Sequence, residues 1–219
     1  GPRLERTRAS FAVTAREAVM GGVRVIIYEP SAGIARRERN KALINVHGGG
    51  FVGCFVECGG LESIPIAALT GMRVISVDYR LAPAARFPAA SEDVASVYRE
   101  ILKTTPARGI GLFGCSAGGM LAAQSLVWFQ RHGLPRPAAA GIYCAGADPS
   151  LAGDSRMLGM LLGDGELPRP ASGRESGPGL GYMSGSSPTD PIAYPASDRS
   201  ALKMFPPTLI VVGTRDFAL

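Results

Sequence analysis

The sequence has few of the residues that bind metal ions or cross-link a small fold. Among its 219 residues are two histidines, His47 and His132, and four cysteines, none of them in a Cys-x-x-Cys pair. Zinc sites need closely spaced cysteine or histidine ligands, so we expect no metal site. Four scattered cysteines are typical of reduced thiols, and we expect a cytoplasmic protein.

Long apolar runs and a strong charge of one sign are absent as well. No apolar segment reaches the length of a membrane span, and no signal peptide is recognised at the start of the chain. The net charge is +5, but the basic residues are scattered, and the densest run, residues 36–41, also contains Glu38. Such a run is typical of a solvated loop, so we expect neither a nucleic-acid partner nor a membrane span. Gly1-Pro2 resembles a remnant of tag removal and is set aside.

What the chain does contain is typical of a globular protein with many turns. Hydrophobic residues make up 46% of it, and 29 glycines and 17 prolines interrupt the apolar runs. Because short apolar strands alternate with stretches of helical spacing, we expect one α/β domain, residues 1–219, with a mostly parallel twisted sheet flanked by helices. The expected strands are Val23–Tyr28, Ala42–Val46, Arg73–Val77, Gly109–Phe113, Ala139–Cys144 and Thr208–Val212. The expected helices are Gly60–Thr70, Ala89–Lys103 and Ala117–Arg131.

Residues 149–207 have a different composition. They are rich in glycine, proline, serine and aspartate, and they show no clear strand. About sixty residues are too many for an ordinary connection between elements. We expect an irregular, cap-like insertion with some short helix that covers the functional site.

The segment Gly114-Cys115-Ser116-Ala117-Gly118 matches the pattern Gly-x-Ser-x-Gly of a nucleophilic serine. It lies between an expected strand and an expected helix, where this sharp turn has to lie. Glycine at positions 114 and 118 removes side chains that would collide within the turn. The helix N-terminus would lie beside the oxygen that becomes negative during the reaction. We therefore predict that Ser116 is the nucleophile.

A second glycine-rich segment, His47-Gly48-Gly49-Gly50, directly follows the expected strand Ala42–Val46. Acyl transfer needs backbone N–H donors aimed at an oxyanion, and glycines let the backbone approach the substrate. We predict that the amides of Gly49, Gly50 and Ala117 are these donors. His47 is expected to fix the loop by hydrogen bonding and not to act as the general base.

The acid and base of the site are less evident. In the chain order that accompanies Gly-x-Ser-x-Gly, the acid follows the serine and the histidine comes last. Asp216, just after the last expected strand, is the preferred acid because open α/β sheets build sites at the carboxyl ends of strands. Asp148 is the alternative. His132 would lie about 24 Å along the helix that Ser116 begins, and no histidine follows Asp216.

Several segments form a joint pattern: His47-Gly48-Gly49-Gly50-Phe51, Asp78-Tyr79-Arg80-Leu81-Ala82-Pro83, Phe87-Pro88-Ala89-Ala90, Gly114-Cys115-Ser116-Ala117-Gly118-Gly119, Pro206-Pro207-Thr208-Leu209-Ile210 and Gly213-Thr214-Arg215-Asp216. Together they resemble the hormone-sensitive-lipase-like family of bacterial carboxylesterases, within the α/β-hydrolase superfamily. The resemblance implies the α/β-hydrolase fold and hydrolysis of short-chain carboxylic esters without a cofactor, by Ser116 and Asp216 with a histidine. It also implies that His47, Gly48, Tyr79 and Arg80 support the oxyanion loop.

The sequence departs from this family in several places. Cys115 stands where members usually have aspartate, and we interpret it as a small residue that fills the turn, with tuning of the nucleophile or a second nucleophile as alternatives. Cys54 and Cys58 are interpreted as buried thiols, with a disulfide between them as the alternative. The family's N-terminal cap helices are mostly absent, and so are its C-terminal strand, helix and histidine loop. We therefore expect this chain to be incomplete and inactive by itself.

Three functions fit the sequence. The leading one is a serine carboxylesterase that forms an acyl-enzyme on Ser116. The alternatives are a ligand-binding protein on a hydrolase scaffold without the catalytic histidine, and an amidase or formamidase with the same machinery. The expected partners are a small-molecule ester substrate and either a second copy of the chain or a missing C-terminal segment.

Overall fold

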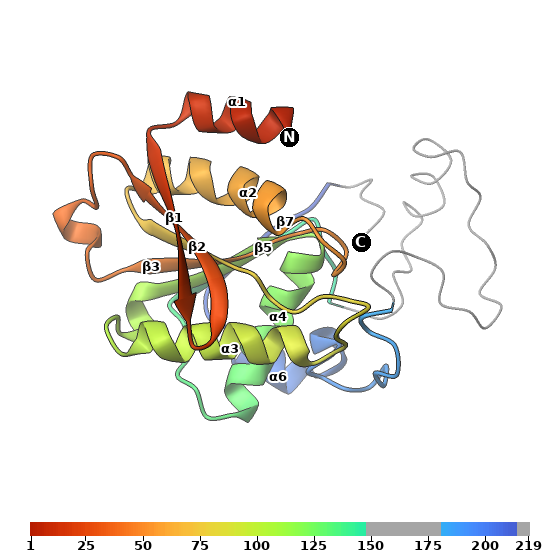
Figure 1. The fold of residues 1–219 in the computed structure, drawn as a ribbon. Helices are drawn as coiled ribbons and strands as arrows, with labels where there is room; N and C mark the ends of the chain where they lie inside the picture. Colours follow the sequence, from red (N-terminus) through yellow and green to blue (C-terminus); the bar gives the residue numbers. More distant parts are fainter. Residues whose placement is uncertain (148–180, 214–219) are drawn as a thin grey trace.

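The computed structural model describes residues 1–147 and 181–213. Within them, one sheet of seven strands has the order β1-β2-β4-β3-β5-β6-β7 (Figure 1). β1 pairs antiparallel with β2, and β2 antiparallel with β4, whereas the remaining pairs are parallel. The expectation of a mostly parallel α/β sheet is confirmed. The strands are β1 Val13–Met20, β2 Val23–Pro30, β3 Ala42–Val46, β4 Arg73–Val77, β5 Ile110–Cys115, β6 Ala139–Tyr143 and β7 Thr208–Val211.

Helices cover both faces of this sheet. On one face α2 packs on the sheet and α1 on α2; α3 and α4 cover the other face (Figure 1). The middle of β2 is apolar because both of its faces are covered. Val25 and Ile27 join the core beneath α3 and α4, while Ile26 and Tyr28 join the core beneath α2. The helices are α1 Pro2–Ser10, α2 Phe55–Thr70, α3 Ala89–Leu102, α4 Ala117–Arg131 and α6 Arg199–Lys203, with 3₁₀ turns η1 Arg36–Glu38, η2 Ala107–Gly109 and η3 Pro195–Ser197.

Two elements at the start of the chain were not expected. Pro2, set aside as part of a tag remnant, is the first residue of α1. Strand β1 forms a hairpin with β2 through Gly21-Gly22, whose φ angles of 58° and 83° only glycine adopts readily. β1 escaped notice because most of its residues are exposed and polar residues interrupt the apolar ones, so it lacks the apolar run by which the other strands were recognised.

Helix α2 begins at Phe55, five residues before the expected start at Gly60. Two adjacent glycines normally disfavour a helix, so Gly59-Gly60 was interpreted as the boundary. The structure explains both glycines by the close packing of neighbouring residues against them. A Cβ on Gly59 would overlap the Ser76 hydroxyl, and a Cβ on Gly60 would lie 2.6 Å from the Leu4 side chain.

The parallel strands bring their carboxyl ends to one edge of the sheet. In the β3–β5 register Val46 pairs with Gly114, so the loop after β3 and the turn after β5 lie side by side. β7 is the edge strand of the described sheet, and Leu209, Ile210 and Val211 on it are exposed. An edge with unpaired backbone groups and apolar side chains is a surface that another segment can cover.

Candidate active site

Ser116 lies in the turn between β5 and α4. Its backbone has φ 56° and ψ −125°, its side chain is exposed, and its amide donates to the Tyr143 carbonyl at 2.8 Å. Positive φ is costly for a serine, and such strain is typical of active sites. The two flanking glycines are required by their neighbours, because a Cβ on Gly114 or on Gly118 would overlap the carbonyl oxygen of Val46.

The glycine-rich loop after β3 lies against this turn. A Cβ placed on Gly48 would lie 3.7 Å from the Ser116 Cβ, which is van der Waals contact. Gly49 and Gly50 have φ angles of 111° and 62°, a region that favours glycine. Among the described residues, no acceptor takes the amide protons of Gly49, Gly50 or Ala117. Within the described residues, the N–H groups of these three predicted oxyanion donors are therefore available to bond a substrate oxygen.

His47 is buried inside the loop. Its Nδ1 is 2.6 Å from the Gly48 carbonyl oxygen, and its Nε2 is buried without a partner among the described residues. Desolvation by burial lowers the pKa of His47 to about 4, so the imidazole is neutral near pH 7. Its ring stacks on that of Tyr79, with 4.3 Å between centroids. The neutral ring is thus occupied in holding the loop.

Tyr79 and Arg80, both expected to support the loop, make different contacts. The Tyr79 hydroxyl donates to the His47 carbonyl at 2.5 Å. Arg80 is tied to α3 instead: its Nε donates to Asp93 at 2.9 Å, and its Nη2 donates to the Ala89 carbonyl at 3.0 Å. Tyr79 therefore touches the loop directly, whereas Arg80 fixes the backbone that carries Tyr79.

Sequence reasoning missed Glu62 on α2. Its carboxylate accepts from the Gly48 amide at 3.1 Å and from the Asn45 side chain at 2.7 Å, and the nearby Cys115 amide lowers the pKa of this group. A glutamate within a mostly apolar helix was the available signal, but nothing in the spacing shows which loops it reaches.

His132 lies away from these contacts. His132 follows the last residue of α4, where its Nδ1 is 2.8 Å from the Trp128 carbonyl and its ring stacks on Trp128. It therefore lies at the opposite end of α4 from Ser116. Asp216 and the alternative Asp148 lie outside the described residues.

The interpretation of Cys54 and Cys58 as free thiols is wrong in this structure, which joins them in a disulfide. Cys54 immediately precedes α2 with a φ of 81°, and this left-handed backbone leaves the two Cα atoms 5.2 Å apart, within disulfide range. Cys115 and Cys144 take part in no disulfide among the described residues, and the first is half-buried while the second is exposed.

The described end of the 149–207 segment packs against the oxyanion loop. The Tyr182 ring stacks on Phe51 with 4.5 Å between centroids, and the Tyr182 hydroxyl accepts from the Ala90 amide at 2.7 Å. Further along, the Ala193 carbonyl accepts from Gln124 on α4 at 2.9 Å. The segment is thus anchored both beside the loop and on α4.

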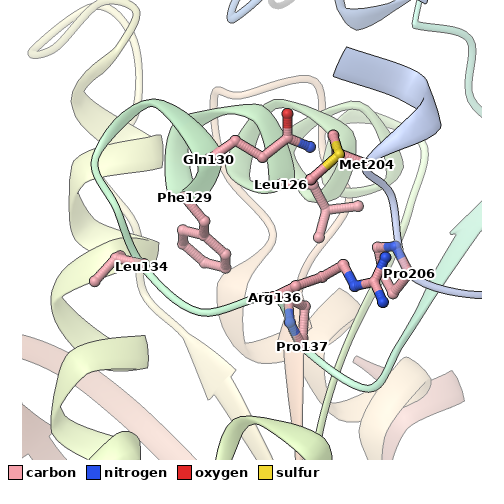
Figure 2. Close-up of a pocket in the computed structure, with 8 residues that line it drawn as sticks. All are labelled: Leu126, Phe129, Gln130, Leu134, Arg136, Pro137, Met204 and Pro206. Carbon is pink, nitrogen blue, oxygen red and sulfur yellow. The ribbon is translucent and has the colours of Figure 1, made fainter. Parts of the chain in front are cut away.

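A cavity of about 290 Å³ lies elsewhere, along the C-terminal half of α4 (Figure 2). Its lining includes Phe129 and Gln130 from α4 and Arg136 from the following loop. Because Ser116 precedes the first residue of α4, this cavity is not the candidate active site.

Comparison with known proteins defines the class. A family described as having the α/β-hydrolase fold matches residues 43–219. The chain is 31% identical over 185 residues to an acetyl-hydrolase of Streptomyces hygroscopicus, covering 82% of this chain and 58% of that protein. The crystal structure of an esterase, E25, matches with a TM-score of 0.82 and 31% identity over 99% of this chain and 66% of that one. A hormone-sensitive lipase from a metagenome library matches with a TM-score of 0.78 and 27% identity, over 99% of this chain and 74% of that one.

The chain therefore belongs to the α/β-hydrolase family, and its resemblance to the hormone-sensitive-lipase-like esterases is confirmed. It spans 58% of the length of the acetyl-hydrolase and 66% of that of esterase E25. None of the helices in the described ranges is long and apolar enough to cross a membrane.

Proposed function

We propose that the protein hydrolyses short-chain carboxylic esters through an acyl-enzyme on Ser116. The observation that carries this proposal is the contact between the exposed serine in its strained turn and the loop whose amides at Gly49 and Gly50 have no described acceptor. An exposed nucleophile beside uncommitted N–H donors is the arrangement that acyl transfer needs. The acetyl-hydrolase and esterase relatives support the same chemistry.

In the proposed reaction, the Ser116 hydroxyl oxygen attacks the ester carbonyl carbon and loses its proton to a general base. The carbonyl oxygen becomes an oxyanion, which the amides of Gly49, Gly50 and Ala117 stabilise. Collapse of this intermediate expels the alcohol and leaves the acyl group on Ser116, and water then releases the acid by the same steps. Each oxyanion donor contributes about 3 kcal/mol in the transition state.

We assign the acid of the triad to Asp216, with Asp148 as the alternative. The base is the component that these residues do not provide. His47 holds Gly48 and has a pKa of about 4, and His132 lies at the far end of α4. We propose that a histidine following Asp216 in the natural chain is the base, in keeping with the chain order of this fold.

Substrate size and location are part of the proposal. The name of the Streptomyces relative, an acetyl-hydrolase, supports a small acyl group. We also propose that residues 149–207 form a cap over the site, since Tyr182 packs on the oxyanion loop. We propose a cytoplasmic location from the few, scattered cysteines, of which Cys54 and Cys58 form the disulfide in the described residues.

The test is covalent labelling of the natural protein that contains residues 1–219. A fluorophosphonate probe is expected to modify Ser116, and Ser116→Ala is expected to abolish both labelling and hydrolysis of p-nitrophenyl acetate. The expected loss of kcat is at least about 10³-fold, because the members of a catalytic triad act as a unit. Labelling that persists in the variant would refute the assignment of the nucleophile.

A panel of p-nitrophenyl esters and the matching anilides separates the alternatives. Preference for short esters supports the esterase. Faster cleavage of anilides would support an amidase, and saturable binding without turnover would support a ligand-binding protein.

A further inference from the structure

Glu62 is a carboxylate that lies beside both the oxyanion loop and the turn of the nucleophile. It lies on α2, and its Oε1 accepts from the amide of Gly48 in the oxyanion loop at 3.1 Å. The amide of Cys115, the residue before the nucleophile, is close enough to lower the pKa of the same carboxyl group. A single side chain from a third element therefore bonds one loop and lies against the backbone of the other.

A chain of buried polar groups fixes the direction of these bonds. The Ser76 hydroxyl donates to Asn45 Oδ1 at 2.8 Å, and Asn45 Nδ2 donates to Glu62 Oε2 at 2.7 Å. Asn45 and Ser76 are fully buried in neighbouring strands β3 and β4. The donors in this chain are thus directed toward the carboxylate, which is purely an acceptor while it is ionised and gains a competing O–H donor when it is protonated.

The contacts also orient the peptide groups of the oxyanion loop. In the peptide that joins His47 to Gly48, the carbonyl accepts from Tyr79 while the N–H donates to Glu62. In the next peptide, the Gly48 carbonyl is held by His47 Nδ1, and a trans peptide directs the Gly49 N–H to the opposite side. Holding the first peptide at both ends therefore sets where the Gly49 amide points.

We propose that Glu62 is a positioning residue, which sets the spacing and orientation of the oxyanion amides relative to Ser116. This inference rests on the proposed function and adds a residue to it that no motif contains. Glu62 acts through the backbone of Gly48 and Cys115 and does not touch the substrate.

The charge of Glu62 makes this positioning of the oxyanion amides dependent on pH. Burial raises the pKa of Glu62 above its ordinary value, although its donors oppose the shift. The titratable groups beside it in the described structure are His47, whose pKa is about 4, and Tyr79, whose pKa is raised by burial and by the Glu62 charge. Both are neutral near pH 7, so Glu62 is the group whose ionisation the bridge depends on. Its protonation removes an acceptor and is expected to loosen the bridge as the pH falls.

The experiment compares Glu62→Gln and Glu62→Leu in the natural protein that contains residues 1–219. Glutamine keeps the shape and one acceptor oxygen, and a flip of the Asn45 amide can restore the remaining bonds. We expect Glu62→Gln to retain kcat for p-nitrophenyl acetate within about tenfold, and Glu62→Leu to lower it at least about 100-fold with little change in KM. The acid limb of the wild-type kcat/KM profile should be steeper, or lie at higher pH, than that of Glu62→Gln.

Glu57 on the same helix provides the matched control. Among the described residues its carboxylate accepts from the nitrogen of Gly1 at 2.6 Å and bonds neither loop, so Glu57→Gln and Glu57→Leu are expected to keep the wild-type kcat and pH profile. A folded Glu62→Leu protein with wild-type kcat would overturn the proposal. If that variant does not fold, superimposable pH profiles of wild type and Glu62→Gln would overturn it.

A measurement that needs no substrate tests this inference separately from the proposed function. Amide hydrogen exchange, followed by NMR, should be faster at Gly48 and Cys115 in the Glu62 variants than in the wild type. A wild-type protein without esterase activity would contradict the proposed function, and unchanged exchange at both amides would contradict the bridge itself.

Discussion

The rings of Tyr79 and His47 stack with 4.3 Å between centroids, and the Tyr79 hydroxyl donates to the carbonyl oxygen of the same histidine. Both residues are buried, so this carbonyl has no access to water as a substitute donor. The tyrosine therefore holds the first peptide of the oxyanion loop by its hydroxyl and the histidine ring by its face.

Tyr79→Phe keeps the stacked ring and removes the hydroxyl. We expect the free energy of unfolding to fall by about 1–3 kcal/mol because a buried carbonyl loses its donor. The value of kcat should fall roughly tenfold with KM little changed, which corresponds to about 1.4 kcal/mol in the transition state. Urea denaturation and p-nitrophenyl acetate kinetics measure the two effects.

Tyr98→Phe is the control for that substitution. Tyr98 is also buried, stacks on Phe129 at 4.4 Å and donates to the Pro135 carbonyl at 2.8 Å, but it lies on α3 away from the loop. It should lose stability without losing kcat. Equal effects of the two substitutions on kcat would contradict a specific role of Tyr79 in the oxyanion loop.

Gly118→Ala tests the close approach of the nucleophile turn to β3. A Cβ at this position would overlap the Val46 carbonyl oxygen and lie 2.7 Å from that of His47, so backbone must move. We expect a loss of about 3 kcal/mol in unfolding free energy and loss of fluorophosphonate labelling. Gly181→Ala, where a Cβ would meet open space, should change neither. If Gly118→Ala has the stability and the labelling of the wild type, the close approach of the turn to β3 is contradicted.

The lowered pKa of His47 predicts that stability depends on pH. In the unfolded chain a histidine binds a proton near pH 6.5, whereas folded His47 does so only near pH 4. The unfolded state therefore binds more protons in this window, so stability falls as the pH drops from about 6.5 towards 4. At pH 4.5 the loss from this residue should be roughly 2–3 kcal/mol relative to pH 7.5. Urea denaturation of His47→Asn, which cannot titrate, should lack this component, and an unchanged slope would argue against the buried neutral imidazole.

Thiol alkylation tests the pairing of the cysteines. In native protein without reductant, iodoacetamide is expected to modify the exposed Cys144 and to leave Cys54 and Cys58 unmodified. Reduction before alkylation should add both of these sites. Peptide mass mapping measures the outcome, and modification of Cys54 without reductant would contradict the disulfide.

Cys115→Ser tests whether the residue before the nucleophile is needed chemically. The contact of Cys115 with Glu62 is made by its backbone amide, which serine retains. We therefore expect the variant to keep more than about half of the wild-type kcat. A loss comparable to that of Ser116→Ala would favour the interpretation of Cys115 as a chemical participant.

The local motifs of the site could be predicted from the sequence because their geometry is set by neighbouring residues. The turn at Ser116 needs glycine on both sides, whatever the rest of the fold does, so Gly114 and Gly118 identify it. The strands β3 and β4 were predicted with their observed bounds, because a strand covered on both faces is a short, mostly apolar run without polar alternation. Helix α4 was also predicted with its observed bounds, because both its apolar spacing and the glycine that ends it are features of the local sequence.

Contacts between distant residues were decided only by the tertiary structure. Glu62 reaches the Gly48 amide because α2 packs against the sheet beside β3, and a bond between residues 14 positions apart leaves no pattern in the sequence. The pairing of Cys54 with Cys58 depends on a left-handed backbone before α2. Sequence patterns record which residues are apolar, small or reactive, but the directions in which side chains and amides point are set only when the elements pack together.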